Sequence, residues 1–175
     1  ISTGVFMVST FSGENGKARL IDELARLMPA EIILPLSQSE HLTKDLMLTG
    51  SVTVTAYLDD AYNRLPALHE LENQFGRDYT SDITGLDFET VIPAAGALLK
   101  YLRETQKRDL SHIKQLSYYY PGKFMLLDAS TRRNLELTRS LSDGSRRNTL
   151  LAVLDYTVTA MGGRLIRNWI EQPLL

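Results

Sequence analysis

The hydrophobic residues of this 175-residue chain change their spacing once, and that change limits the folds open to it. Up to about residue 128, short apolar runs typical of strands alternate with apolar positions three or four residues apart, the spacing of one helix face. After Gly144 only the helical spacing remains, first over 150–154 and then over 165–170. Alternating strands and helices favour an α/β layer, and stripes without strands favour helix packed on helix. We therefore expect two structural units.

The charged residues divide at the same place. Residues 1–128 hold 12 basic and 17 acidic side chains, whereas residues 129–175 hold seven basic and four acidic ones, and all seven are arginines. We expect one domain over 1–128 and the start of another over 129–175, although a short basic tail on a single domain would give the same count. The net charge of −2 argues against a chain that binds nucleic acid along its whole length.

The composition excludes several classes of protein and site. The chain has no cysteine, which excludes disulfides, thiolate metal sites and a cysteine nucleophile. No apolar run approaches the roughly 20 residues that a membrane-spanning helix needs, so we expect no membrane partner. The absence of cysteine fits a cytoplasmic location. The chain starts without Met and stops directly after a helical pattern. We expect both ends to be cut from a longer protein.

The first domain opens with a strand, a helix and a second strand. Val5 to Phe11 form an apolar run, the turn at 13–16 follows, and residues 20–28 carry a helical stripe that Pro29 ends. Ile32 to Leu34 then form a short buried-looking strand. This order predicts a right-handed crossover packed on one sheet.

The rest of the first domain continues the alternation. We expect a short helix or loop, a strand, a helix that Gly76 ends, a surface loop, a longer helix, and two strands joined at Pro121-Gly122 as a hairpin. The second helix has its apolar stripe on Leu65, Leu68, Leu71 and Phe75. Asp128, Ser130 and Thr131 are each capable of capping the following helix, which Leu135 and Leu137 carry, and Asp128 fits a cap better than a catalyst. The short helix or loop lies at 36–50, the strand at 52–57, the helix at 65–75 and the surface loop at 77–90. The longer helix lies at 93–107, and the two strands of the hairpin lie at 113–120 and 124–127.

Two long stretches resemble the MutS family of DNA mismatch repair proteins. LDASTRRNLELT at 127–138 and TLLAVLDYTVTAMGGRLIRNWIEQPLL at 149–175 look like the start of the family's core domain. The connector domain of the family is similar to STGVFMVSTF at 2–11, ELARLMPAEIILP at 23–35 and AAGALLKYLRETQKRDLSHI at 94–113. Essentially the whole chain is covered, while the segment from Ser37 to Ala56 offers no firm match.

The resemblance implies a fold and a role. Residues 1–128 would be a connector with an RNase H-like α/β fold, a mixed sheet flanked by helices, and residues 129–175 the first helices of an all-α core (lever) domain. The connector would link the mismatch-reading, core and ATPase domains, transmit the ATP-dependent conformational change and offer a docking surface for MutL. The full-length protein would be a bacterial, cytoplasmic, nucleoid-associated homodimer that binds mismatched duplex DNA, ATP and magnesium.

The family's own catalytic and reading motifs do not occur in this sequence. Gly13 to Lys17 come nearest to a phosphate-binding loop, but the spacing is too short and Ala18 supplies no hydroxyl for magnesium. Phe88-Glu89 lacks the residue between Phe and Glu of the mismatch-reading motif. We expect no catalytic, cofactor-binding or metal-binding residue here, and no enzyme activity from this chain.

An RNase H-like fold raises the alternative of a metal-dependent nuclease, which needs several carboxylates around two metal ions roughly 4 Å apart. Asp59, Asp60 and Asp128 follow predicted strands. However, adjacent acids on an extended chain diverge, and all three are natural helix caps. The three histidines, at 41, 69 and 112, have no metal-ligand spacing.

Two sets of residues remain as candidates for contacts with partners. We expect MutL to dock on the polar face of the 61–75 helix, at His69, Glu70, Asn73 and Gln74. We expect other helices of the core to pack on Gly162, Gly163, Arg164 and Trp169, because two glycines in a helix favour close approach of another backbone. Four arginines of the second domain are predicted either to contact DNA phosphates or to organise carboxylates in domains outside these residues, with the second use favoured: Arg132, Arg133, Arg146 and Arg147.

Overall fold

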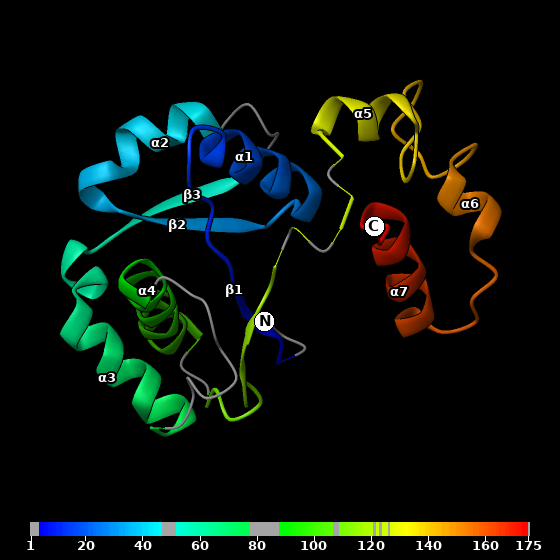
Figure 1. Ribbon diagram of the computed structural model, residues 1–175. Coiled ribbons are helices and arrows are strands. Elements are labelled where there is room, and N and C mark those ends of the chain that lie inside the picture. The colour runs from blue at the N-terminus through cyan, green and yellow to red at the C-terminus, as the bar shows by residue number, and fades with distance from the viewer. Residues whose placement is uncertain are drawn as a thin grey trace. The chain divides into compact units, whose positions relative to one another are not determined.

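The chain divides into two units that are not continuous in sequence. A computed structural model describes residues 4–46, 52–77, 88–106, 109–120, 122, 124–125 and 127–174 (Figure 1). The first unit comprises residues 1–17 and 28–119, and the second comprises residues 18–27 and 120–175. Within the described residues, no helix is long and apolar enough to cross a membrane.

The first unit is a mixture of helices and two small parallel sheets. The strands in its described residues are β1 (Phe6–Val8), β2 (Glu31–Pro35), β3 (Thr53–Tyr57) and β4 (Leu116–Tyr118). Its helices are α2 (Ser39–Leu46), α3 (Arg64–Phe75) and α4 (Phe88–Gln106), with short 3-10 turns at Leu36–Gln38 and Asp59–Tyr62. The α/β class expected from the sequence is confirmed.

The strand pairing differs from the prediction in two places. β1 pairs with β4, with Phe6 opposite Leu116, and β2 pairs with β3, with Glu31 opposite Thr53. The predicted crossover from β1 to β2 is therefore wrong, and the parallel crossover runs from β2 through α2 to β3. Periodicity marks a strand but does not choose its partner. Here Phe6 and Leu116 are both buried in one core, which parallel pairing brings together.

The predicted hairpin is wrong for a related reason. β4 joins β1 in parallel, and Phe124 forms an isolated antiparallel bridge with Leu174 in the second unit. Met125 also donates its backbone N–H to the Pro173 carbonyl at 2.8 Å. The distant end of the chain supplies this partner, so no local turn signal could have indicated it.

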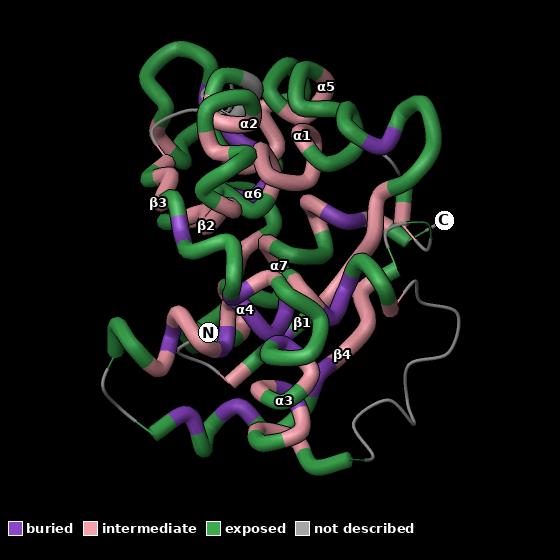
Figure 2. The backbone as a smooth tube through the Cα atoms, turned by 90° about the vertical axis from the view of Figure 1, so that its left-hand side faces the viewer, coloured by how far each residue is buried: buried purple, intermediate pink, exposed green. Residues whose placement is uncertain are grey.

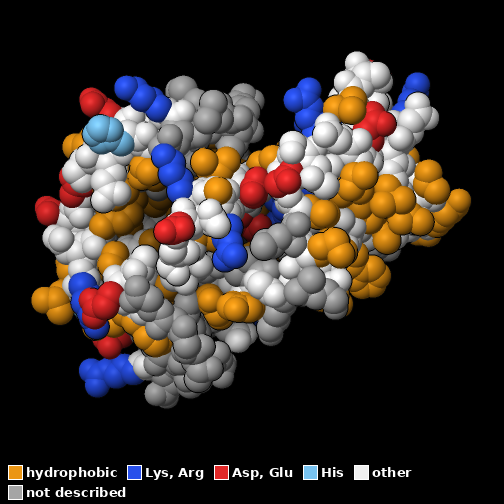
Figure 3. Space-filling model, turned by 45° about the horizontal axis from the view of Figure 1, so that its top comes forward, with side chains coloured by type: hydrophobic (Ala, Val, Ile, Leu, Met, Phe, Trp, Pro, Cys, Tyr) orange, Lys and Arg blue, Asp and Glu red, His pale blue; other side chains and the backbone are white. Residues whose placement is uncertain are grey.

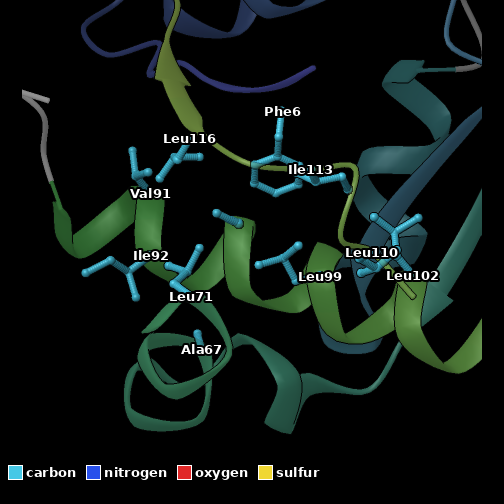
Figure 4. Close-up of a cluster of buried hydrophobic side chains, with 11 residues drawn as sticks. Phe6, Ala67, Leu71, Val91, Ile92, Leu99, Leu102, Leu110, Ile113 and Leu116 are labelled. Carbon is cyan, nitrogen blue, oxygen red and sulfur yellow. The ribbon is translucent and has the colours of Figure 1, made fainter. Parts of the chain in front are cut away.

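The core of the first unit lies where α3 and α4 meet β1 and β4 (Figures 2 and 4). Leu71 and Leu99 are fully buried there, together with Ile113. The two helices approach closely at Gly96, where an added Cβ would lie 2.4 Å from the Cα of Ala67. Packing of this kind removes apolar area from water and leaves few voids.

Both helices of this core depart from the predicted pattern. Ala67 takes the buried position beside Leu71, while Leu65 is 78% exposed, so the predicted stripe was wrong at its first member. Helix α4 starts at Phe88 and contains Pro93. The loop predicted at 77–90 is therefore wrong at residues 88–90, which belong to the helix. The helix tolerates Pro93 because burial of Val91 and Ile92 offsets the loss of the backbone hydrogen bond that proline cannot donate. Residues 78–87 of that loop lie outside the described residues.

Two tyrosines join the second sheet to α4. The Tyr57 hydroxyl donates to Glu104 at 2.6 Å, and the Tyr101 hydroxyl donates to Glu31 at 2.5 Å. The two rings also meet edge to face, with centroids 5.2 Å apart. Burial and the nearby Glu104 carboxylate raise the pKa of Tyr57, so it stays a neutral hydrogen-bond donor. The cluster fixes the sheet edge against the helix.

The second unit is helical, as the sequence predicts. It contains α5 (Ala129–Asn134), α6 (Leu150–Leu154) and α7 (Ala160–Glu171), together with most of α1 (Gly16–Leu27). Asp128 caps α5 by accepting from the Thr131 N–H at 2.6 Å, which confirms the predicted cap. The predicted helix over Leu135 and Leu137 is shorter than expected, since α5 ends at Asn134.

Candidate functional site

The polar face of α3 is divided between two directions. Glu70 and Gln74 are turned toward α4 and the segment before β4, where their side chains have hydrogen-bond partners within the unit. His69 and Asn73 are exposed. The four residues predicted to dock MutL therefore lie on one helix but do not form one free surface.

Arg103 of α4 organises the inward half of this face. Its guanidinium donates to Glu70 at 2.6 Å and to the side-chain oxygen of Gln74 at 3.1 Å. The Gln74 amide donates in turn to the carbonyls of Leu110 and Ile113 at 3.0 and 2.9 Å. These bonds satisfy two backbone carbonyls in the segment before β4, which is not itself part of a strand, so Gln74 has a structural role. Arg103 carries no local sequence signal for this contact, so its role was not predicted.

The outward half of the face is small and polar. The side-chain amide of Asn73 lies 3.0 Å from Nδ1 of His69, one helical turn away. Both side chains are exposed, and the hydrogen bond holds the two together as a pair. This pair is the part of the predicted site that remains accessible to a partner. Nothing in the geometry tests the docking role itself, which stays a prediction.

The arginines of the second domain differ in their surroundings. Arg132 is half-buried and donates to the Asp22 carbonyl at 3.3 Å, and burial lowers the pKa of its guanidinium. Arg146 forms an ion pair with Asp155. Arg133 and Arg147 are exposed. Arg132 and Arg146 therefore have partners within their own unit. The predicted contacts of the four arginines with other domains or with DNA stay a prediction.

The glycines predicted to receive another backbone face their own preceding loop. A Cβ on Gly162 would lie 3.0 Å from the side chain of Thr157, and one on Gly163 would lie 3.4 Å from the hydroxyl of the same threonine. Thr159 caps this helix by accepting from the Gly162 N–H at 3.0 Å. Arg164 is exposed and Trp169 is 61% exposed. The predicted packing of other helices here stays a prediction.

The carboxylates named in the nuclease alternative have hydrogen-bond partners of their own. Asp59 accepts from the backbone N–H and hydroxyl of Ser37 at 3.1 and 2.8 Å, so the predicted helix-capping role of Asp59 is wrong. The Asn63 amide reaches Asp60 at 3.5 Å. Within the described residues, no group of three or more His, Cys, Asp or Glu side chains could hold a metal ion. The observed carboxylates therefore give the nuclease alternative no support.

The glycine turn after β1 behaves as an ordinary turn. Gly13 has a left-handed backbone with φ of 82°, and its carbonyl accepts from the Gly16 N–H at 3.0 Å. A Cβ on Gly16 would lie 3.0 Å from the Phe11 carbonyl oxygen. Glycine is therefore used here for backbone geometry at the start of α1.

Comparison with known proteins gives matches over nearly the whole chain. A family model described as MutS domain II matches residues 1–114, and one described as MutS domain III matches residues 130–175. The chain is 58% identical over 175 residues to the DNA mismatch repair protein MutS of Pelotomaculum thermopropionicum. It is 44% identical over 177 residues to that of Symbiobacterium thermophilum. Both alignments cover 100% of this chain and 20% of the relative, so the chain spans about a fifth of the length of these relatives.

Proposed function

The chain belongs to the MutS family of DNA mismatch repair proteins, and on that premise we propose that it is a noncatalytic connector and relay of a mismatch-recognition ATPase. The observation that carries the proposal is the order of the two matches, domain II followed by domain III. Residues 1–128 are the connector, with an RNase H-like fold, and residues 129–175 begin the helical core (lever) domain.

A set of contacts around α1 supports the relay. This helix follows β1 in sequence, yet its residues 18–27 belong to the second unit. There the Asp22 carboxylate accepts from the Ala129 N–H at 3.1 Å, at the start of α5, and the Asp22 carbonyl accepts from Arg132. Both ends of the helix continue into strands of the first unit. A movement of α5 is therefore transmitted to the chain that enters and leaves the first unit.

The substrates of the reaction belong to other parts of a full-length family member. We propose that this larger protein is a homodimer in the bacterial cytoplasm and on the nucleoid, and that it binds mismatched duplex DNA, ATP and magnesium outside these 175 residues. The chain's own contribution is to connect the domains that carry out these steps.

The second part of the proposal is that MutL docks on the outward pair of α3, His69 and Asn73. Support comes from their exposure and from the fixed orientation of the helix behind them. Arg103 holds Glu70 and Gln74 against α4, so the exposed face does not need to be ordered when a partner binds. A preorganised surface loses less conformational entropy on association.

The test is calorimetric titration of the 175-residue chain with purified MutL. The double variant His69→Ala/Asn73→Ala removes the outward pair without touching the contacts of Arg103. We expect its Kd to rise about tenfold, which corresponds to about 1.4 kcal/mol. The matched control is Gln38→Ala/His41→Ala, which removes an exposed amide and an exposed imidazole from the region of α2.

Three outcomes separate the parts of the proposal. Weaker binding of the α3 variant alone supports docking at the pair. If both variants bind MutL with the Kd of the unmodified chain, the docking surface lies elsewhere. If the unmodified chain does not bind MutL, docking by this chain is refuted, while its family membership stands on the sequence matches.

A further inference from the structure

An open pocket in the second unit is lined by arginines. It has a volume of about 510 Å³ and lies between α7 and the segments around Arg139 and Asp155. On α7, the residues that reach it are Ala160, Gly163, Arg164 and Arg167, an i, i+3, i+4, i+7 pattern that places them on one face of the helix. Gly163 is one of them, and its lack of a side chain leaves the pocket open at that point. The four arginines of the pocket are Arg139, Arg146, Arg164 and Arg167.

The positive charge of the pocket is only partly neutralised. Arg146 is paired with Asp155, and Arg167 donates to Glu171 at 2.9 Å. Arg139 and Arg164 form no ion pair within the part of the chain that the structure describes. Each guanidinium offers a planar set of donors that suits a carboxylate or a phosphate. The pocket is thus suited to an anionic group with at least two acceptor oxygens.

A second face of the same helix is apolar and exposed. Met161, Leu165 and Trp169 are spaced four residues apart and are 79%, 49% and 61% exposed. Helix α7 has no fully buried residue. Figure 3 shows hydrophobic side chains gathered on the surface of the unit that holds α6 and α7. An exposed apolar patch of this kind, next to unpaired charge, marks an interaction surface.

We propose that α7 docks an acidic amphipathic helix, whose carboxylates pair with Arg139 and Arg164 and whose apolar side chains cover Met161, Leu165 and Trp169. The inference deepens the packing role that the sequence predicts for this helix and rests on that prediction. It adds the chemistry of the partner, which is a protein helix with acidic residues beside an apolar stripe.

The combination of the two faces selects this partner over other anions. Free phosphate or a nucleic-acid backbone satisfies the arginines but offers no apolar surface to the stripe. An uncharged apolar helix covers the stripe but leaves Arg139 and Arg164 without acceptors. A helix with acidic residues three or four apart on one face and apolar residues at the same spacing on the adjacent face satisfies both the arginines and the apolar stripe.

The test uses Trp169, the only tryptophan of the chain, as its reporter. The probe is a synthetic helical peptide of alanine, leucine and glutamate, without tryptophan or tyrosine, with leucine on one face and glutamate on the adjacent face. We expect a blue shift of the emission on binding, since the indole leaves water. In the variant Arg139→Ala/Arg164→Ala the Kd should rise more than about tenfold, because two charge-assisted hydrogen-bonded pairs are lost.

The controls separate the acidic chemistry from the packing role. The variant Arg133→Ala/Arg147→Ala removes two exposed arginines that do not line the pocket, and its affinity should change less than about twofold, as for weak surface charges. A matched peptide with glutamine in place of glutamate should bind more weakly. If it binds equally well and shifts the emission, the acidic chemistry is refuted and packing stands. If neither peptide shifts the emission, both are refuted.

A last pair of probes addresses other anions. Inorganic phosphate and a short duplex oligonucleotide are titrated against the same chain. Binding of either that needs Arg139 and Arg164, without a shift of the Trp169 emission, would replace the proposal with a simple oxyanion site. Absence of such binding, together with the peptide result, supports the protein partner.

Discussion

Replacement of Gly96 by alanine tests the packing of α3 on α4 most directly. An ideal Cβ at this position would lie 2.4 Å from both the Cα and the Cβ of Ala67 and 2.6 Å from its carbonyl oxygen. Carbon atoms in favourable contact are about 3.5–4.0 Å apart, so the helices would have to separate by roughly 1 Å. The obstacle is backbone, which cannot rotate away as a long side chain can.

Two opposing effects set the size of the change. Alanine is favoured over glycine in a helix interior by about 0.8–1.0 kcal/mol. Overpacking of a well-packed core costs about 1–3 kcal/mol. Gly96 is buried and faces Ala67, which belongs to the same buried cluster as Leu71 and Leu99. The upper half of that range applies because the added methyl group meets the backbone of Ala67. We expect Gly96→Ala to destabilise the first unit by about 1–2 kcal/mol, the difference between these two effects.

Amide hydrogen exchange is the suitable assay, because the two units need not unfold together and Trp169 reports only on the second. A loss of about 1–2 kcal/mol should speed exchange of the slowest α3 and α4 amides by roughly 5–30-fold, with α7 unchanged. The matched control is Gly163→Ala, where the nearest atom to an added Cβ is 3.4 Å away, an ordinary contact. It should slow exchange in α7. Unchanged or slower exchange in Gly96→Ala would refute the close-approach reasoning.

The other predictions concern a helix cap and a buried hydroxyl. Thr149 is 1% exposed, accepts from the Ala152 N–H at 3.1 Å and donates to the Arg146 carbonyl at 2.7 Å. Thr149→Ala should cost about 1–2 kcal/mol in urea unfolding followed by Trp169 emission, and Thr149→Ser should restore most of it. Among the residues that the structure describes, the buried Tyr62 hydroxyl has no hydrogen-bond partner, and burial raises the pKa of Tyr62 to about 12. A raised pKa favours the neutral hydroxyl in the folded state, so the contribution of Tyr62 to stability is complete below pH 10 and is lost as the pH rises toward 12. Between pH 10 and 12 the urea midpoint of Tyr62→Phe should therefore fall less than that of the unmodified chain.

The sequence by itself determined the family and most of the local structure. The long stretches at 127–138 and 149–175 resembled the MutS core domain, and the match of residues 130–175 to MutS domain III confirms this resemblance. Gly76 ends α3 with a φ of 82°, and Asp128 caps α5, both as predicted. Turns, caps and helix periodicity depend on residues within a few positions of each other, so one sequence is enough to indicate them.

Only the tertiary structure decided which segments meet. The partner of β4 is β1, more than 100 residues earlier, and the close approach of α3 and α4 depends on Gly96 facing Ala67. The predicted docking face was divided by Arg103, which holds Glu70 and Gln74 inward. Each of these contacts joins residues far apart in the chain. Hydrophobic spacing specifies that a face is buried but not against what, because many segments offer an apolar surface of similar area and only their joint packing selects one arrangement.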